Sequence, residues 1–159
     1  MFQILRDFFQ GPASARGETG ESTVSVELAT AVLLVEAMRA DQGAAPEERA
    51  AIGHALQERF ALSPDQVQQL LALAEERSRV ANDFFAFTHA LNQRLTHPEK
   101  IHVIEQMWQV AWVDGSADPG ESHVISRVAG LLHVTHGEYL AAKLRAQQAA
   151  LSAAGPSPA

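Results

Sequence analysis

A repeated stretch constrains this chain more than any other feature of its sequence. Residues 35–52 and 108–125 align at a constant offset of 73 residues. The aligned pairs include Asp41 with Asp114, Pro46 with Pro119, Glu48 with Glu121, and Ile52 with Ile125. After one deleted residue the alignment resumes at an offset of 72, pairing Phe60 with Leu132, Leu62 with Val134, Ser63 with Thr135, and Val67 with Tyr139. Each copy predicts the same unit: a helix ending at an Asp, a short turn, a helix begun by Pro, and a capped third helix.

The remaining pattern predicts helices and no sheet. Apolar residues recur at helical spacing, whereas Asn-Gly hairpins and sustained alternation of apolar and polar residues are absent. The first three predicted helices cover residues 1–10, 23–41 and 46–60, and a fourth starts at Pro64. An amphipathic segment follows at 84–91. This segment is either a separate helix or a continuation of the fourth through a kink near Asn82. Three more start at segments 96–99, 118–121 and 135–138, the first of these ending at Gly115. We expect an all-α fold of seven or eight helices in two similar halves related by a pseudo-twofold axis, since two copies are too few for a solenoid.

Composition along the chain divides it into four segments. Residues 1–10 are expected to form an amphipathic helix, and residues 11–22, rich in Gly, Ser and Thr, a flexible linker. We expect residues 23–153 to form the helical domain and residues 154–159 to be a disordered tail. Three interpretations of the N-terminal helix stay open: docking on its own domain, binding another copy or a partner, or lying on a membrane surface.

Composition and missing motifs exclude several functional classes. The absence of cysteine excludes disulfides, thiolate metal sites and cysteine nucleophiles. With 12 Lys+Arg against 19 Asp+Glu the formal charge is −7, which disfavours nucleic acid as a partner. No run approaches the ~20 apolar residues of a membrane span, and the start lacks a secretory signal pattern. The Walker loop, the nucleophile elbow and the zinc HExxH motif are all absent. We therefore expect a cytoplasmic, non-enzymatic domain with a protein partner, and a homodimer is an open alternative. Any contact with the inner membrane is expected only through the N-terminal helix.

Paired carboxylates in the two copies are the candidate site. Each copy has an Asp at the end of one helix and a Glu in the first turn of the next, which are Asp41 and Glu48, then Asp114 and Glu121. Capping of a helix start explains both glutamates. An Asp at a helix C-terminus opposes the helix dipole by ~0.3–1 kcal/mol, so the two aspartates call for a cation or for hydrogen bonds from the next helix. Both explanations stay open. An all-oxygen site would select Ca²⁺, Mg²⁺ or Mn²⁺, although the segment 114–121 is too short for an EF-hand.

The segments 36–49 and 108–121 resemble the two signatures of the TerB-like (tellurite resistance) family, in which a helix ends in Ala-x-x-Asp-Gly and a Glu follows seven residues after the Asp. The second segment fits this pattern, whereas the first keeps its Asp and Glu but has Gln42 where the second has Gly115. The resemblance covers about residues 24–145 and implies an all-helical fold of two related halves.

The same resemblance implies a cluster of acidic residues implicated in binding a divalent metal, carried over here to Asp41, Glu48, Asp114 and Glu121. It further implies a role in tellurite resistance and bacterial stress responses. The expected function is a non-enzymatic, cation-binding accessory or scaffold domain. The alternative is a protein-interaction or structural module without metal. Because the chain has no thiols, we do not expect it to reduce oxyanions itself.

Overall fold

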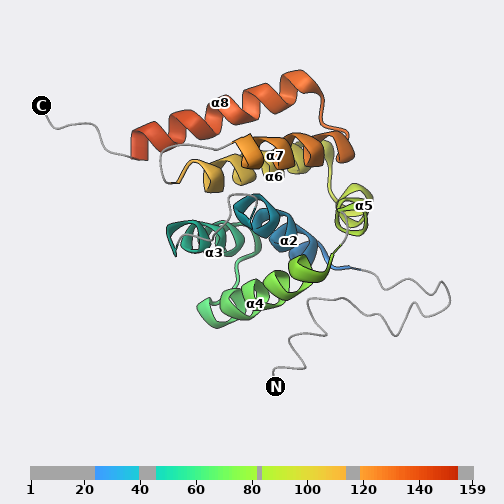
Figure 1. Cartoon of the computed structure of the whole chain (residues 1–159), viewed down its shortest axis with the longest axis vertical. Coiled ribbons are helices and arrows are strands. Elements are labelled where there is room, and N and C mark those ends of the chain that lie inside the picture. Colours follow the sequence, from blue (N-terminus) through green and yellow to red (C-terminus); the bar gives the residue numbers. More distant parts are fainter. Residues whose placement is uncertain (1–23, 40–45, 82–83, 114–118, 154–159) are drawn as a thin grey trace, which may run out of the picture.

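The computed structural model describes residues 24–39, 46–81, 84–113 and 119–153 (Figure 1). This part of the chain folds into seven helices and contains no strand, which confirms the all-α prediction. The helices are α2 (Val26–Arg39), α3 (Pro46–Phe60), α4 (Pro64–Val80), α5 (Phe85–Arg94), α6 (His97–Ala111), α7 (Pro119–Leu131) and α8 (His136–Ala153). The predicted N-terminal helix 1–10, the linker 11–22 and the tail 154–159 lie outside the described residues. No helix of the described part combines the length and the apolar character that crossing a bilayer requires.

Capping boxes set the starts of three helices, as the sequence predicts. In each, a Ser or Thr side chain accepts a hydrogen bond from the backbone N–H three residues later, and the side chain at that later position accepts one from the Ser or Thr N–H. The pairs are Ser63 with Gln66 before α4, Thr96 with Glu99 before α6, and Thr135 with Glu138 before α8. These contacts satisfy backbone donors that a helix start otherwise leaves open.

The structure settles one helix boundary that the sequence left open, and it differs from a second, predicted boundary. α4 ends at Val80 and α5 begins at Phe85, so the two are separate helices and not one kinked helix. α6 ends at Ala111, ahead of the predicted end at Gly115. There the Trp112 N–H still bonds to the carbonyl of Trp108, but the Val113 N–H bonds to Val110 at 3.2 Å, three residues back. This tightening of the last turn closes the helix before a glycine is needed.

α2 is the central helix of the fold. It contacts α3, α4, α5, α6 and α7, and Figure 1 shows it between α4 on one side and α6 on the other. The predicted inward residues are buried: Val24, Leu28, Ala31, Val35 and Met38. Val32, Leu33 and Leu34 are buried as well, so α2 is covered on all sides and not along one stripe.

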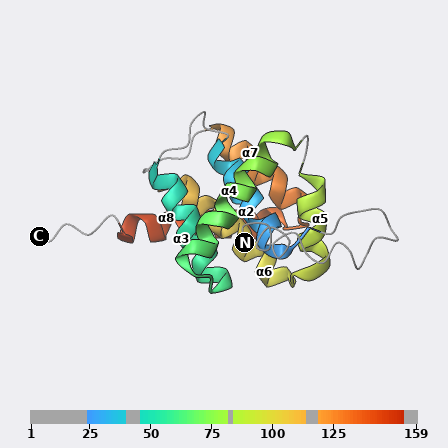
Figure 2. The ribbon, with the colours of Figure 1, turned by 90° about the horizontal axis from the view of Figure 1, so that it is seen from below.

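α8 packs on α6 at the edge of the molecule away from α4 (Figure 1), and in the view from below its last turns extend past α3 (Figure 2). Its buried residues include Ala142 and Ala146, whose small side chains permit close approach of the two helices. Larger apolar residues of α8 face outward instead: Leu140, Leu144 and Leu151 are 42%, 56% and 69% exposed. α8 therefore contributes little bulk to the core and leaves an apolar outer face.

The order of helices agrees with the duplicated unit. α2, α3 and α4 come in the same order as α6, α7 and α8, with α5 between the two sets. The residues that follow the middle helices also match, because Ala61 and His133 both adopt left-handed backbone with φ of 54° and 64°. These two positions lie 72 residues apart, the offset found in the sequence. The pseudo-twofold axis itself stays a prediction.

Candidate functional site

Glu48 is a buried carboxylate in the first turn of α3. It is 1% exposed, and among the described side chains no other Asp or Glu is buried. Ile52 lies one turn further along the same face and is fully buried, while Glu47 is exposed. Successive helix residues are rotated by roughly 100°, so Glu48 points inward where its neighbours point out. The sequence could have indicated this, since Glu48 and Ile52 stand four residues apart.

Arg49, the residue after Glu48, fixes the orientation of α3 about its axis relative to α4, and in this orientation Glu48 points inward. Its Nε lies 3.0 Å from Glu75 Oε2 and its Nη2 lies 3.2 Å from Glu75 Oε1, a paired contact with α4. Its Nη1 also donates to Gln68 Oε1 at 3.2 Å. The hydrogen bond to Glu75 raises the pKa of Arg49. A two-point contact of this kind sets orientation as well as distance, so the outer face of α3 is fixed against α4.

Glu48 is buried more deeply than the glutamates that cap helices in this chain. The glutamates that do cap helices, Glu99 and Glu138, stay at the surface, and the side chain of Glu138 is 34% exposed. Hydrogen bonds donated by the backbone N–H groups of Thr96 and Thr135 lower the pKa of these two carboxyls. Burying a charged carboxylate costs several kcal/mol unless other groups or a metal ion compensate it. Glu48 therefore occupies a different environment from the capping glutamates of this chain.

The other three predicted ligands fall largely outside the described structure. Asp41 and Asp114 lie outside the described residues, and Glu121 lies in the first turn of α7 with a side chain that is likewise not described. Among the residues that are described, no three of His, Asp and Glu come together as a metal site. The helices that start with Glu48 and Glu121 do share their neighbours, because α3 and α7 both pack on α2 and α6. The structure thus places one predicted ligand and the helix that holds a second.

A polar cluster between α3 and α6 was not indicated by the sequence. Arg59 donates from Nε to Gln106 Oε1 at 2.8 Å and from Nη2 to His102 Nδ1 at 2.7 Å. Gln106 is 1% exposed and also donates to the carbonyl of Ala55 at 3.4 Å. Burial lowers the pKa of Arg59, and burial followed by the charge of Arg59 lowers the pKa of His102. No spacing rule joins these residues, so only the tertiary structure reveals them.

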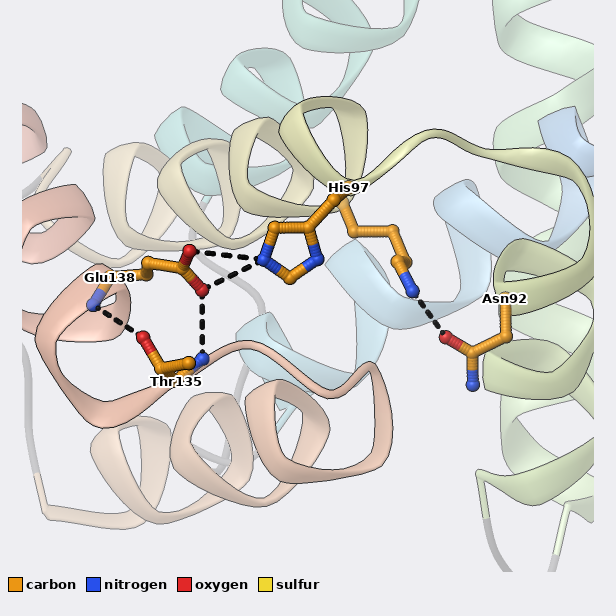
Figure 3. A network of polar contacts seen from close by, with 5 residues as sticks. Asn92, His97, Thr135 and Glu138 are labelled. Carbon is orange, nitrogen blue, oxygen red and sulfur yellow. Dashed lines mark hydrogen bonds and ion pairs between the residues drawn. The ribbon is translucent and has the colours of Figure 1, made fainter.

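A second set of polar contacts joins α5, α6, α7 and α8 (Figure 3). His97 Nε2 lies 2.9 Å from Glu138 Oε1, which ties the start of α6 to the start of α8. Lys100, only 9% exposed, donates from Nζ to Asn92 Oδ1 at 3.0 Å. Asn92 in turn donates from Nδ2 to the carbonyl of Leu131 at 3.0 Å. These contacts hold helices together, and they show how α5 is joined to both α6 and α7.

Comparison with known proteins bears on the whole helical domain. The family model described as "Tellurite resistance protein TerB" matches residues 27–144, from the start of α2 into α8. The comparisons with curated proteins and with solved structures gave no match. The matched range spans well over half of the 159 residues and includes both copies of the repeat. This chain, with its all-helical fold and its two carboxylate-bearing copies, belongs to the TerB family of tellurite resistance proteins.

Proposed function

We propose that this TerB-family chain is a non-enzymatic accessory domain that binds a divalent cation and acts as a scaffold for a protein partner in a bacterial stress response. The burial of Glu48 at the start of α3 is the observation that carries the proposal. The cation would be Ca²⁺, Mg²⁺ or Mn²⁺, since carboxylate oxygens suit hard ions. Its ligands would come from Asp41, Glu48, Asp114 and Glu121.

Two further observations support the proposal. The Asp and Glu recur in both copies at an offset of 73 residues, although other positions in the copies differ. The helices that begin with these glutamates, α3 and α7, both pack on α2 and α6. A cation between the copies would offset the cost of burying Glu48 and the dipole penalty at Asp41 and Asp114.

The second candidate is a protein-interaction or structural module without metal. The use of Glu99 and Glu138 as capping groups favours it, because it shows that this chain places glutamates at helix starts for that purpose. The exposed apolar face of α8 fits an interaction role under either candidate. The two candidate functions predict different effects of a divalent cation on the stability of the fold: stabilisation for the cation-binding domain and none for the module without metal.

The test is thermal unfolding of the chelator-treated chain with and without each of the three ions. A ligand at 100 times its dissociation constant stabilises the native state by about 2.7 kcal/mol. For a domain of this size we expect the midpoint to rise by roughly 5–10 °C. Glu48→Gln and Asp114→Asn should remove that rise. Glu47→Gln changes the neighbouring exposed carboxylate and should keep it.

The outcomes separate the two candidates. A rise that disappears in Glu48→Gln and persists in Glu47→Gln assigns the cation to the buried carboxylate. Midpoints that do not respond to any ion at millimolar concentration contradict the cation site and leave the interaction module. A rise that persists in both Glu48→Gln and Asp114→Asn means that the cation binds elsewhere on the acidic surface.

A further inference from the structure

A groove lies between α5 and α7. Its volume is about 560 Å³, and it is lined on one side by Phe85, His89 and Gln93 of α5. On the other side Gly130 and Leu131 of α7, and His133 just beyond, complete the lining. The lining therefore combines apolar surface with side chains that donate and accept hydrogen bonds. A lining of this composition suits an amphipathic segment, which has both apolar and polar side chains to place against it.

Contacts within the lining hold its shape. The Asn92 side chain donates to the carbonyl of Leu131 at 3.0 Å, which joins the two sides of the groove. Lys100 on α6 donates a hydrogen bond to the Asn92 side chain, which fixes the position of this amide. On α5 the rings of Phe85 and His89 stack with centroids 5.5 Å apart. A preformed groove costs less to occupy than one that has to open.

We propose that the N-terminal segment 1–10 of this chain docks into this groove. Its sequence, MFQILRDFFQ, places apolar residues including Phe2, Leu5 and Phe9 on one face of the expected helix, with Arg6 at the edge of that face and Gln3 and Asp7 on the other side. A helix of ten residues is marginal on its own in water, so its apolar face needs a surface. Phe85 and Leu131 supply apolar contact, and the amide and imidazole groups of the lining supply partners for polar side chains.

The position where the described chain begins favours this groove. The described residues begin at Val24, which is 8% exposed, directly before α2, and α2 contacts both α5 and α7. The thirteen residues 11–23 reach at most about 45 Å. Tethering by a short linker gives an effective concentration on the order of millimolar, so a weak contact suffices.

A second exposed apolar surface in the described part of the chain is a poorer site for the same segment. It consists of Leu140, Leu144 and Leu151 on the outer face of α8. α8 packs on α6, so this face points away from α2, and it is the outside of a single helix and not a groove (Figure 1). The α5–α7 groove therefore fits the segment better on both position and shape.

Paramagnetic broadening in the cysteine-free chain tests the proposal. A nitroxide on Gln3→Cys is the only labelled thiol, because the natural sequence has none. We expect loss of amide signal at Gln93 and Gly130, and none at Leu151 on α8. Phe9→Ser should abolish the loss, whereas Asp7→Ser, opposite the apolar face of the expected helix, should keep it.

A matched pair of glycine substitutions tests the groove side. A Cβ atom at Gly130 or at Gly137 meets nothing within 4 Å, so both positions accept a side chain in the folded chain. Gly130→Gln places an amide in the groove and should abolish the broadening, whereas Gly137→Gln, outside the groove, should leave it unchanged. Signal loss at Leu151, or no loss anywhere, would overturn the proposal.

Mixing separates docking within one chain from docking between chains. Spin-labelled chain without isotope is mixed with isotope-labelled chain without the nitroxide. We expect no broadening in this sample. Broadening at Gln93 that appears in the mixture assigns the groove to a second copy and contradicts docking within one chain.

Discussion

Glu138 on α8 contacts His97 on α6 through both carboxylate oxygens, which lie 2.9 and 3.0 Å from His97 Nε2 (Figure 3). The same carboxylate accepts a hydrogen bond from the Thr135 N–H at 2.9 Å, as the second half of a capping box. One side chain thus caps α8 and joins it to the first turn of α6. The capping glutamate of α6 itself, Glu99, has no such contact with a histidine among the described residues.

Replacing Glu138 by glutamine should destabilise the fold in a pH-dependent way. Hydrogen bonds from Thr135 and then from His97 lower the pKa of Glu138 below its unfolded value of about 4.3. A lowered pKa means that the carboxylate stabilises the fold above the unfolded pKa and that this contribution is lost as pH falls through the folded pKa. Glu138→Gln should therefore lower the unfolding midpoint at neutral pH, with a deficit that disappears in acid.

Glu99→Gln is the control for the histidine contact. The pKa of Glu99 is also lowered, chiefly by the Thr96 backbone and least by the charge of Arg59, so this variant loses the charge of a capping box that has no histidine contact. We expect a smaller neutral-pH deficit than for Glu138→Gln. Equal deficits, measured by thermal unfolding across the pH range, would show that the His97 contact contributes nothing.

Removing the guanidinium of Arg59 should destabilise the fold, because buried Gln106 loses its hydrogen-bond donor. Arg59→Met leaves the Oε1 of Gln106, a side chain that is 1% exposed, without its donor. An unsatisfied buried polar group costs about 1–3 kcal/mol. Replacing both residues, as Arg59→Met with Gln106→Leu, removes donor and acceptor together and should cost less than the sum of the single changes. Chemical unfolding of the four proteins gives the coupling, and strictly additive costs would contradict it.

His102 should titrate below an ordinary histidine. Burial and then the charge of Arg59 lower its pKa from about 6.5. Because the folded pKa is lowered, the neutral imidazole stabilises the fold above about pH 6.5, and this contribution is lost as pH falls through the folded value. NMR titration of the ring proton should give a low value in the natural chain. Arg59→Met should raise it part of the way, since burial, the larger cause, stays; an unchanged value would contradict the role of Arg59.

Ala61 is a position where glycine should improve stability. Its φ of 54° is left-handed, which costs an L-residue roughly 1–2 kcal/mol and costs glycine nothing. Ala61→Gly should raise the free energy of unfolding by up to about 1 kcal/mol after the extra entropy of the unfolded chain is counted. The same change at Ala72, exposed in the middle of α4, should lower it by about 1 kcal/mol. Unfolding in denaturant should show opposite signs for the two variants.

Helix starts were the part of the fold most accessible from the sequence. Ser63, Thr96 and Thr135 predict the starts of α4, α6 and α8 because a capping box is a contact within four residues. The central place of α2 was not predicted from its one-face pattern, although its run Ala31 to Val35 is apolar on every side. A helix that is apolar all round is a sign of full burial, and that sign is visible in the residues alone.

The candidate site shows where local reasoning stops. Spacing identified Glu48 as a ligand or a cap, but its burial follows from the packing of α3, which Arg49 and Glu75 help to set. The Arg59–Gln106 pair joins positions far apart in the chain, so no pattern within either helix could indicate it. The gathering of Asp41, Asp114 and Glu121 with Glu48 stays a prediction, since it depends on residues or side chains outside those described.

The central position of α2 has a consequence for how the chain acquires its fold. α2 belongs to the first copy, yet α6 and α7 of the second copy cover part of it. During synthesis α2 leaves the ribosome before α6 and α7 are made. Part of its apolar surface therefore stays uncovered until the second copy is complete. A chain cut between the copies should therefore yield two fragments that fold poorly apart and recover the native structure when mixed. Because α2 is shared in this way, we expect the two copies to unfold as one cooperative unit and not as two small domains.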